Sequence, residues 1–241
     1  MGRKKHSIVD LLLVSLLLAA VVCGWHLYSD YRTGVAADAA VGEMHELKPS
    51  IDEGEGASDG RDFGALQTGN PDIIAWLAIP GTVIDYPVVQ TSDNDFYLSH
   101  DAQKNINTNG ALFLDYRAHP DFSDFVNVIY GHHMQSGIMF QNLMNFKDQT
   151  FFDNQRIGTL YTPEKTWQLE FFATAVVSYD SDIYDYTLSS PAEKEAYFEG
   201  VKEVALQYRD IDLSASDRIV VLSTCSYEYA DARSVVLARL V

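Results

Sequence analysis

An apolar run near the N-terminus constrains this chain more than any other feature. From Leu11 to Leu27 the sequence reads LLLVSLLLAAVVCGWHL, without Asp, Glu, Lys or Arg. Such a run is slightly short but sufficient to cross the hydrocarbon core of a bilayer. We therefore expect one transmembrane helix over residues 8–28.

The residues that flank this run predict its orientation. Arg3, Lys4 and Lys5 precede it, and Trp25 and Tyr28 stand at its far end, where the headgroup region favours aromatic rings. Basic flanks stay on the cytoplasmic side of a membrane. The prediction is a single-pass protein of the cell membrane, with residues 1–7 as a cytoplasmic tail and everything beyond the helix outside the cytoplasm.

A cleaved signal peptide is the alternative to this anchor. Ala37-Asp38-Ala39 has the small-x-small form of a cleavage site, but it lies well beyond the apolar run. Cys23 suggests a lipoprotein signal, but Val21 and Val22 before it are bulkier than such sites usually accept. Under every one of these alternatives the remainder of the chain is exported.

The cysteine count adds a second constraint. The chain holds only Cys23, inside the apolar run, and Cys225, near the C-terminus, so these two do not plausibly pair. Exported domains usually use cysteines in pairs. A lone cysteine is more often a buried, inert residue than a nucleophile, but an unpaired thiol outside the cytoplasm raises the question of whether it reacts.

Composition limits the partners and divides the exported part. The formal charge of −17 and the lack of a basic stripe exclude a nucleic-acid partner, because phosphate binding requires clustered Lys and Arg. Residues 29–66 are polar, acidic and rich in small residues, which predicts a partly helical extracytoplasmic stalk. Residues 67–241 are the expected globular domain, and an apolar content of 47% is enough for its core.

Short β-rich segments dominate this globular part. Alternating or β-branched apolar residues predict strands over residues 73–77, 83–89, 111–115, 125–130, 156–161, 167–179, 218–222 and 234–241. Pro87 favours an edge or an end for the strand that contains it. Many short strands with few helices predict a mostly-β barrel or sandwich that carries helical insertions.

Helical spacing is clear in one segment only, Pro191 to Tyr208. Ser189 or Ser190 can cap this helix, and proline suits its first turn. Shorter helical turns are expected at residues 95–99 and 138–146.

Cys225 follows the strand predicted at 218–222, where side chains leave the core and reach a cleft. Arg233 opens the next strand, so a hairpin would place the two side chains opposite each other. A thiol reacts as thiolate, which nearby positive charge favours, and a guanidinium can also hold an oxyanion. Arg233 cannot act as a base, and on its own it is more typical of a surface ion pair.

The base has to be a histidine from another part of the chain. His6, His26 and His45 are poor candidates, because they fall in the predicted tail, membrane run and stalk. His132 and His133 follow the strand predicted at 125–130. A cysteine and a histidine far apart in sequence can still meet, since such pairs are defined by geometry and not by order.

Gly131 precedes this histidine pair, and we expect it to let the backbone turn so that an imidazole enters a cleft. A metal site that combines His119, His132, His133 and Cys225 is the competing interpretation. No paired ligand spacing of the usual kind supports that site.

These motifs together resemble the sortases, the cysteine transpeptidases of Gram-positive bacteria. The resemblance covers about Asn70 to Val241. The segments that carry it are NVIYGHHM at 127–134, VLSTC at 221–225 and ARSVV at 232–236. The His-His-Met tandem, the STCSYE stretch and the helix before the last strands resemble class B sortases in particular.

This resemblance implies a closed β-barrel with helical insertions and an N-terminal helical extension as the catalytic domain. It also implies Cys225 as nucleophile, His132 as proton donor and acceptor, and Arg233 as oxyanion stabiliser together with a backbone N–H near the cysteine. His133 would have a packing or cleft role. Substrate contacts are expected from Ser223, Thr224 and Tyr227.

The implied reaction cleaves a C-terminal sorting signal after Thr and transfers the acyl group to a peptidoglycan amine, which anchors surface proteins to the cell wall. It demands no cofactor and no metal. The same residues would serve a hydrolytic cysteine peptidase or a pilin-polymerising sortase, and a membrane-anchored binding domain with an incidental cysteine is the non-enzymatic alternative.

Overall fold

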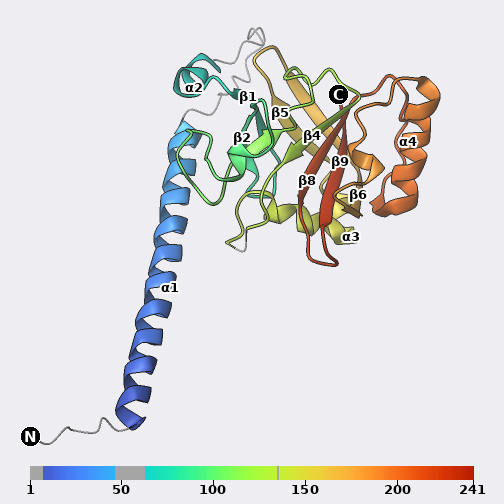
Figure 1. The fold of residues 1–241 in the computed structure, drawn as a ribbon. Helices are drawn as coiled ribbons and strands as arrows, with labels where there is room; N and C mark the ends of the chain where they lie inside the picture. The colour runs from blue at the N-terminus through green and yellow to red at the C-terminus, as the bar shows by residue number, and fades with distance from the viewer. Residues whose placement is uncertain (1–7, 47–62, 135) are drawn as a thin grey trace, which may run out of the picture. The chain divides into compact units, whose positions relative to one another are not determined.

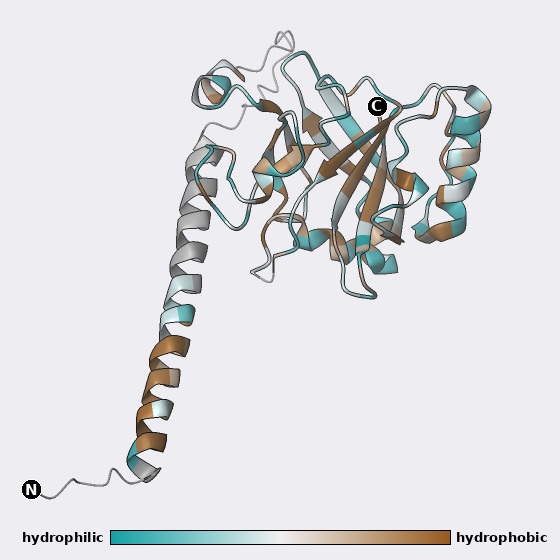
Figure 2. Cartoon of the chain, viewed as in Figure 1, coloured by the Kyte–Doolittle hydropathy of each residue, from teal (hydrophilic) through white to brown (hydrophobic). Residues whose placement is uncertain are grey.

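The computed structural model describes residues 8–46, 63–134 and 136–241 (Figure 1). The expected basic tail at 1–7 and the middle of the expected stalk, 47–62, lie outside these residues. Helix α1, Ile8–Glu46, contains the apolar run, and its segment from Asp10 to Ser29 is long and apolar enough to cross a membrane. Figure 2 shows this apolar stretch along the first half of the helix.

The rest of the described chain, which we call the barrel domain, is built mainly from strands. They are β1 Ile73–Ala78, β2 Asp85–Val89, β3 Leu112–Leu114, β4 Val126–Tyr130, β5 Ile157–Tyr161, β6 Thr166–Ser178, β7 Ala205–Tyr208, β8 Ile219–Cys225 and β9 Ala232–Leu240. Helix α2, Phe63–Gly69, precedes the first strand, and further helical elements lie between the strands: η1 Phe96–Leu98, η2 Phe140–Lys147, α3 Gln149–Asn154, η3 Asp182–Tyr184 and α4 Pro191–Val204.

The strands close into a barrel, which confirms the barrel implied by the family resemblance. Their order is β5-β1-β2-β3-β4-β8-β9-β6-β7, and β5 also pairs with β6, so eight of the nine strands form a ring. The long strand β6 makes this closure possible. Its first residues pair with β5 through Glu170, and beyond that point β7 takes the same edge from Ala173 onward. Full closure leaves the barrel strands without a free edge.

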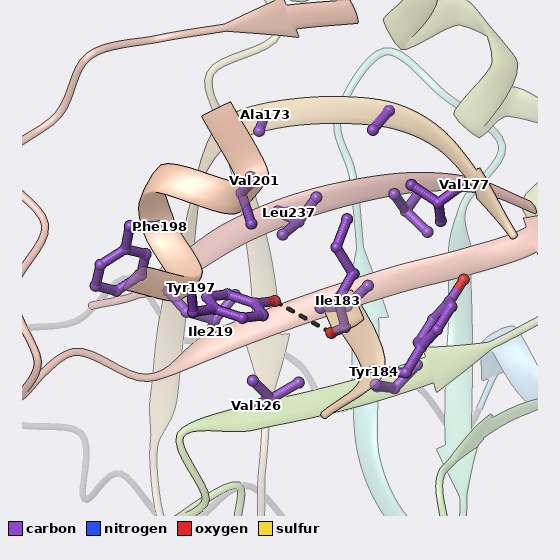
Figure 3. Packing of buried hydrophobic residues seen from close by; sticks show 14 of the residues in the cluster. Val126, Ala173, Val177, Ile183, Tyr184, Tyr197, Phe198, Val201, Ile219 and Leu237 are labelled. Carbon is purple, nitrogen blue, oxygen red and sulfur yellow. Dashed lines mark hydrogen bonds between the residues drawn. The ribbon is translucent and has the colours of Figure 1, made fainter. Parts of the chain in front are cut away.

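Helix α4 covers one face of the strands β6, β8 and β9. Its buried residues Tyr197, Phe198 and Val201 pack against a cluster that includes Ile219 and Leu237 (Figure 3). The N-terminus of the helix is fixed by a capping box, in which the Ser190 hydroxyl accepts from the Glu193 N–H and the Glu193 carboxylate accepts from the Ser190 N–H.

The predicted helix over 191–208 is too long by four residues. It ends at Val204, and Ala205–Tyr208 form strand β7 instead, with Gln207 paired to Thr174 of β6. The reason is tertiary, because the apolar residues of this segment fit helical spacing while the part of β6 that extends beyond its pairing with β5 offers hydrogen bonds to another strand.

Two other expectations need adjustment. Pro87 lies inside β2, where Trp76 of β1 is its partner, and pairing with β3 on the other side starts only at Val88. Pro87 therefore lies at a position where β2 is paired with β1 alone, just before its pairing with β3 begins. Helix α2 belongs to the barrel domain, since Phe63 and Leu66 are buried in its core, so the folded part begins ahead of residue 67.

Gly131 is required for a different reason from the one expected. Its φ is not positive, but a Cβ there would lie 2.4 Å from Leu112 Cδ2 and 2.8 Å from Phe140 Cδ2. The backbone after β4 therefore packs directly against the core, and this close approach leaves no space for a side chain.

This packing predicts opposite outcomes for two glycines. Gly131→Ala should lower the free energy of unfolding by about 1–3 kcal/mol, because the added methyl overpacks the core. Gly200→Ala, in the exposed middle of α4, meets no atom within 4 Å and should raise it by about 0.5–1 kcal/mol. Denaturant titration of the full-length protein in detergent measures both values. Equal effects at the two positions would show that Gly131 is not tightly packed.

Candidate active site

The ends of three strands meet at one cleft of about 460 Å³. Strand β4 leads into His132, β8 ends at Cys225, and Arg233 stands near the start of β9. The sequence predicted that these side chains share a cleft, and all three line it. The other lining residues are Asn94, Asp95, Leu98, Phe113, Tyr130, Gly131, Tyr179, Tyr184, Ser223 and Thr224.

Pairing of β8 with β9 places Arg233 directly opposite Cys225. Both side chains are half-buried. The guanidinium donates through Nη1 to the carbonyl of Ala232 at 3.0 Å, and no carboxylate within the described residues forms an ion pair with it. The alternative of a surface ion pair therefore does not describe this arginine, whose charge is available to the cleft.

His132 is held from two sides. Its Nε2 donates to the carbonyl of Leu98 at 2.8 Å, so this nitrogen carries a proton in both the neutral and the charged imidazole. Gly110 lies against the ring, since a Cβ there would be 3.0 Å from His132 Cδ2, and the φ of +60° at this glycine is one that side chains rarely adopt. The second nitrogen, Nδ1, is the one that can gain and lose a proton.

His133 turns to a different partner. Its Nδ1 donates to the carbonyl of Cys225 at 3.1 Å, and its ring lies 5.2 Å from the ring of Tyr227. The two adjacent histidines therefore contact different parts of the site. The one expected to carry protons lines the cleft, and its neighbour contacts the backbone of the nucleophile candidate.

The three residues expected to contact substrate lie in different environments. Ser223 and Thr224 line the cleft, but both are buried, and the Ser223 hydroxyl is hydrogen-bonded to the Tyr184 hydroxyl at 2.9 Å. Tyr227 is 75% exposed, on the β8–β9 loop, and is not among the residues that line the cleft.

Several cleft residues were missed by sequence reasoning. Leu98 and Gly110, which hold His132, and the cleft-lining Asn94 and Asp95 all come from the segment between β2 and β3. Only a short helical turn was expected there, and no motif in that segment indicated chemistry. Leu98 contributes a main-chain carbonyl and Gly110 the absence of a side chain, and both contributions leave little trace in a single sequence.

The buried Tyr184 and the half-buried Tyr130 both line the cleft. Burial raises the pKa of Tyr184 to about 12 and that of Tyr130 well above its usual range, so both are neutral hydroxyls. Tyr130 donates to the carboxylate of Asp115 at 3.2 Å. Burial would raise the pKa of this fully buried Asp115, but hydrogen bonds from Arg117 bring it below the ordinary value.

The loop after the nucleophile candidate is fixed by a polar cluster. The Lys147 ammonium donates to the Ser226 hydroxyl at 3.2 Å and pairs with the Glu228 carboxylate, which also accepts from Ser226. These contacts, that with Lys147 first, lower the pKa of Glu228 to about 2. The Ser226 N–H donates to the Ala232 carbonyl at 2.9 Å, so it is already used within the hairpin.

The competing metal site finds no support in the part of the chain that is described. Among these residues no group of His, Cys, Asp and Glu side chains is arranged to hold a metal ion. The contacts of His132 and His133 are with main-chain carbonyls instead.

Comparison with known proteins agrees with this geometry. The profile of the Sortase domain family matches residues 77–241. Sortase B of Listeria monocytogenes is 30% identical over 237 residues, which is 93% of this chain and 95% of that protein.

Two solved structures share the fold. A crystal structure of sortase B from Bacillus anthracis superposes with a TM-score of 0.78 at 30% identity and covers 88% of this chain and 99% of that one. The Staphylococcus aureus sortase B-substrate complex gives 0.70 at 26% identity and covers 74% of this chain and 84% of that one. With the family profile over most of the barrel domain, these matches identify the chain as a member of the sortase family, similar in sequence and fold to sortases of class B.

Proposed function

We propose that this sortase is a cysteine transpeptidase of the class B type, which cleaves a C-terminal sorting signal after Thr and transfers the acyl group to a peptidoglycan amine. The observation that carries the proposal is the shared cleft of Cys225, His132 and Arg233. A thiol, an imidazole and an unpaired guanidinium are the groups that acyl transfer through a thioester requires.

The first half of the reaction forms the acyl-enzyme. The Cys225 thiolate attacks the Thr carbonyl of the sorting signal, and the charge that develops on the carbonyl oxygen is held by Arg233. The Ser226 N–H is bonded to Ala232, which leaves the guanidinium as the main donor on this side of the thiol. Protonated His132 then gives its Nδ1 proton to the departing amine.

The second half returns the enzyme to its starting state. A peptidoglycan amine attacks the thioester carbonyl, His132 takes up the proton of that amine, and Cys225 leaves as thiolate. No metal or organic cofactor enters this scheme. The Leu98 carbonyl contributes by fixing the imidazole, since it keeps Nε2 protonated throughout and reserves Nδ1 for both transfers.

The substrate is an extended peptide in this proposal. The cleft runs between the β4 and β8 ends on one side and the η1 segment on the other, and its walls are largely aromatic and apolar. The Staphylococcus aureus relative is described as a substrate complex, which supports recognition of a sorting signal on this fold. The similarity to class B sortases favours a signal of the Asn-Pro-x-Thr-Asn or the Pro-x-Thr-Gly type.

The N-terminal helix is the membrane anchor in the same proposal. The apolar segment from Asp10 to Ser29 has the length for one crossing, and its leucine and valine side chains are exposed along the helix. The basic residues before it favour a cytoplasmic N-terminus, which puts the barrel domain on the side of the cell wall.

Mass spectrometry tests the proposal directly. The protein is incubated with a small library of candidate pentapeptides, and the expected result is a Cys225 adduct with the mass of the acyl fragment that ends in Thr. Product analysis with and without an added amine then separates transfer from hydrolysis. Absence of any acyl adduct across the library, with a folded protein, contradicts the proposal.

Replacement of the nucleophile gives a matched pair of variants. Cys225→Ala should abolish both the acyl adduct and product formation, because no other thiol is present in the barrel domain. Cys23→Ala, at the cysteine of the apolar helix, should retain activity within about twofold of wild type. A far-UV spectrum of each variant confirms folding, and residual transfer by Cys225→Ala would assign the chemistry to another group.

Arg233 is expected to stabilise the oxyanion, and His132 is expected to transfer protons. Arg233→Lys should lower kcat by about 10²-fold, because an ammonium cannot reproduce the planar guanidinium fork next to the oxyanion. His132→Ala should lower it further, since neither proton transfer then has a partner. Initial rates with a saturating sorting peptide measure both, and full activity in Arg233→Lys would mean that a point charge is sufficient.

A further inference from the structure

The hydrogen bond between His133 and the carbonyl of Cys225 has no role in the reaction described above. It joins the residue next to the proton-transferring histidine to the main chain of the nucleophile, across 92 positions of sequence. We propose that His133 is a positioning residue, which fixes the distance between His132 and Cys225 by replacing a missing rung of the β-ladder. This inference rests on the proposed function.

The register of strands β4 and β8 shows which rung is missing. The two strands are parallel, with Tyr130 opposite Ser223, and the ladder continues past the strand end because the Gly131 N–H donates to the Ser223 carbonyl at 3.1 Å. Parallel strands repeat this bond every two residues. The next rung would run from the N–H of residue 133 to the carbonyl of residue 225.

The backbone leaves the ladder at this point. Residue 133 instead forms a bridge with Met139, and the Phe140 N–H donates to the His132 carbonyl at 3.1 Å, so the chain turns back on itself after the strand. This turn brings the His132 side chain to the cleft. The Cys225 carbonyl would lose its partner, and the His133 imidazole supplies one from the side chain.

The imidazole of His133 can take the place of the missing backbone N–H donor. The carbonyl of Cys225 can only accept, so Nδ1 of His133 must carry the proton, either as the neutral Nδ1–H tautomer or as imidazolium. The ring is half-buried and lies beside Tyr227, which limits its rotation. His132 is at the same time held by Leu98, so the side chains of two adjacent histidines fix the positions of His132 and Cys225.

A pair of substitutions isolates the hydrogen bond. Asn and Leu have similar shapes and are both neutral, but only Asn places an N–H donor near the position of Nδ1. His133→Asn should keep kcat for the sorting peptide within about threefold of wild type. His133→Leu should lower kcat by about tenfold or more with KM little changed, because small displacements of reacting groups are costly to the rate.

The same exchange at an exposed histidine is the control. His119 is exposed and lies outside the cleft, so His119→Asn and His119→Leu should both behave as wild type. Wild-type kcat in His133→Leu would overturn the inference, since the bond would then be dispensable. Equal and severe loss in both His133 variants would also overturn it, because the imidazole itself would then be needed.

Two measurements do not depend on turnover. The alkylation rate of Cys225 by iodoacetamide, in protein without peptide, should fall in His133→Leu and be kept in His133→Asn, even if no peptide in the library proves to be a substrate. A ¹⁵N spectrum of the histidine side chains should show a protonated Nδ1 for His133 in the wild-type protein. An unprotonated Nδ1 would overturn the inference even if the Leu variant fails to fold.

Discussion

Parallel pairing of β4 with β8 is the constraint on which the site depends. Parallel strands end at the same edge of a sheet, so residues that follow them emerge side by side however far apart they are in sequence. In this protein the edge presents His132 after one strand and Cys225 at the end of the other. The antiparallel partner β9 starts at that edge and brings Arg233 into register with the cysteine.

The barrel makes this edge rigid. Strands β4 and β8 lie between β3 and β9 in a closed ring, their buried side chains are mostly apolar, and α4 seals the face of β8 and β9 further along. A ring of paired strands offers few ways to shift one strand against its neighbour, because a one-residue slip would move every side chain of β4 or β8 to the opposite face, where other side chains are already packed. The candidate catalytic residues are thus carried by strand ends, and only the segments beyond those ends remain to be fixed.

Single polar contacts fix these last segments. The Leu98 carbonyl and the close approach of Gly110 hold the His132 ring, the His133 imidazole holds the Cys225 carbonyl, and Lys147 with Glu228 holds the loop beyond. Each of these contacts lies at a place where the regular ladder stops. This arrangement is common in proteins, where a rigid scaffold positions the loops and strand ends that carry function.

The sequence by itself determined the apolar helix, most of the strands and the meeting of Cys225, His132 and Arg233 in one cleft. Periodicity, composition and motif order are local properties, and the strands at 125–130 and 218–222 were visible in them. Only the tertiary structure decided the end of α4 at Val204, the place of Pro87 within β2 and the steric reason for Gly131. Each depends on which segment lies alongside, as β6 does for β7 and Phe140 for Gly131. The hydrogen bonds from His133 to Cys225 and from His132 to Leu98 were also decided by the tertiary structure alone. A hydrogen bond to a carbonyl that is distant in sequence leaves no periodic pattern in the sequence.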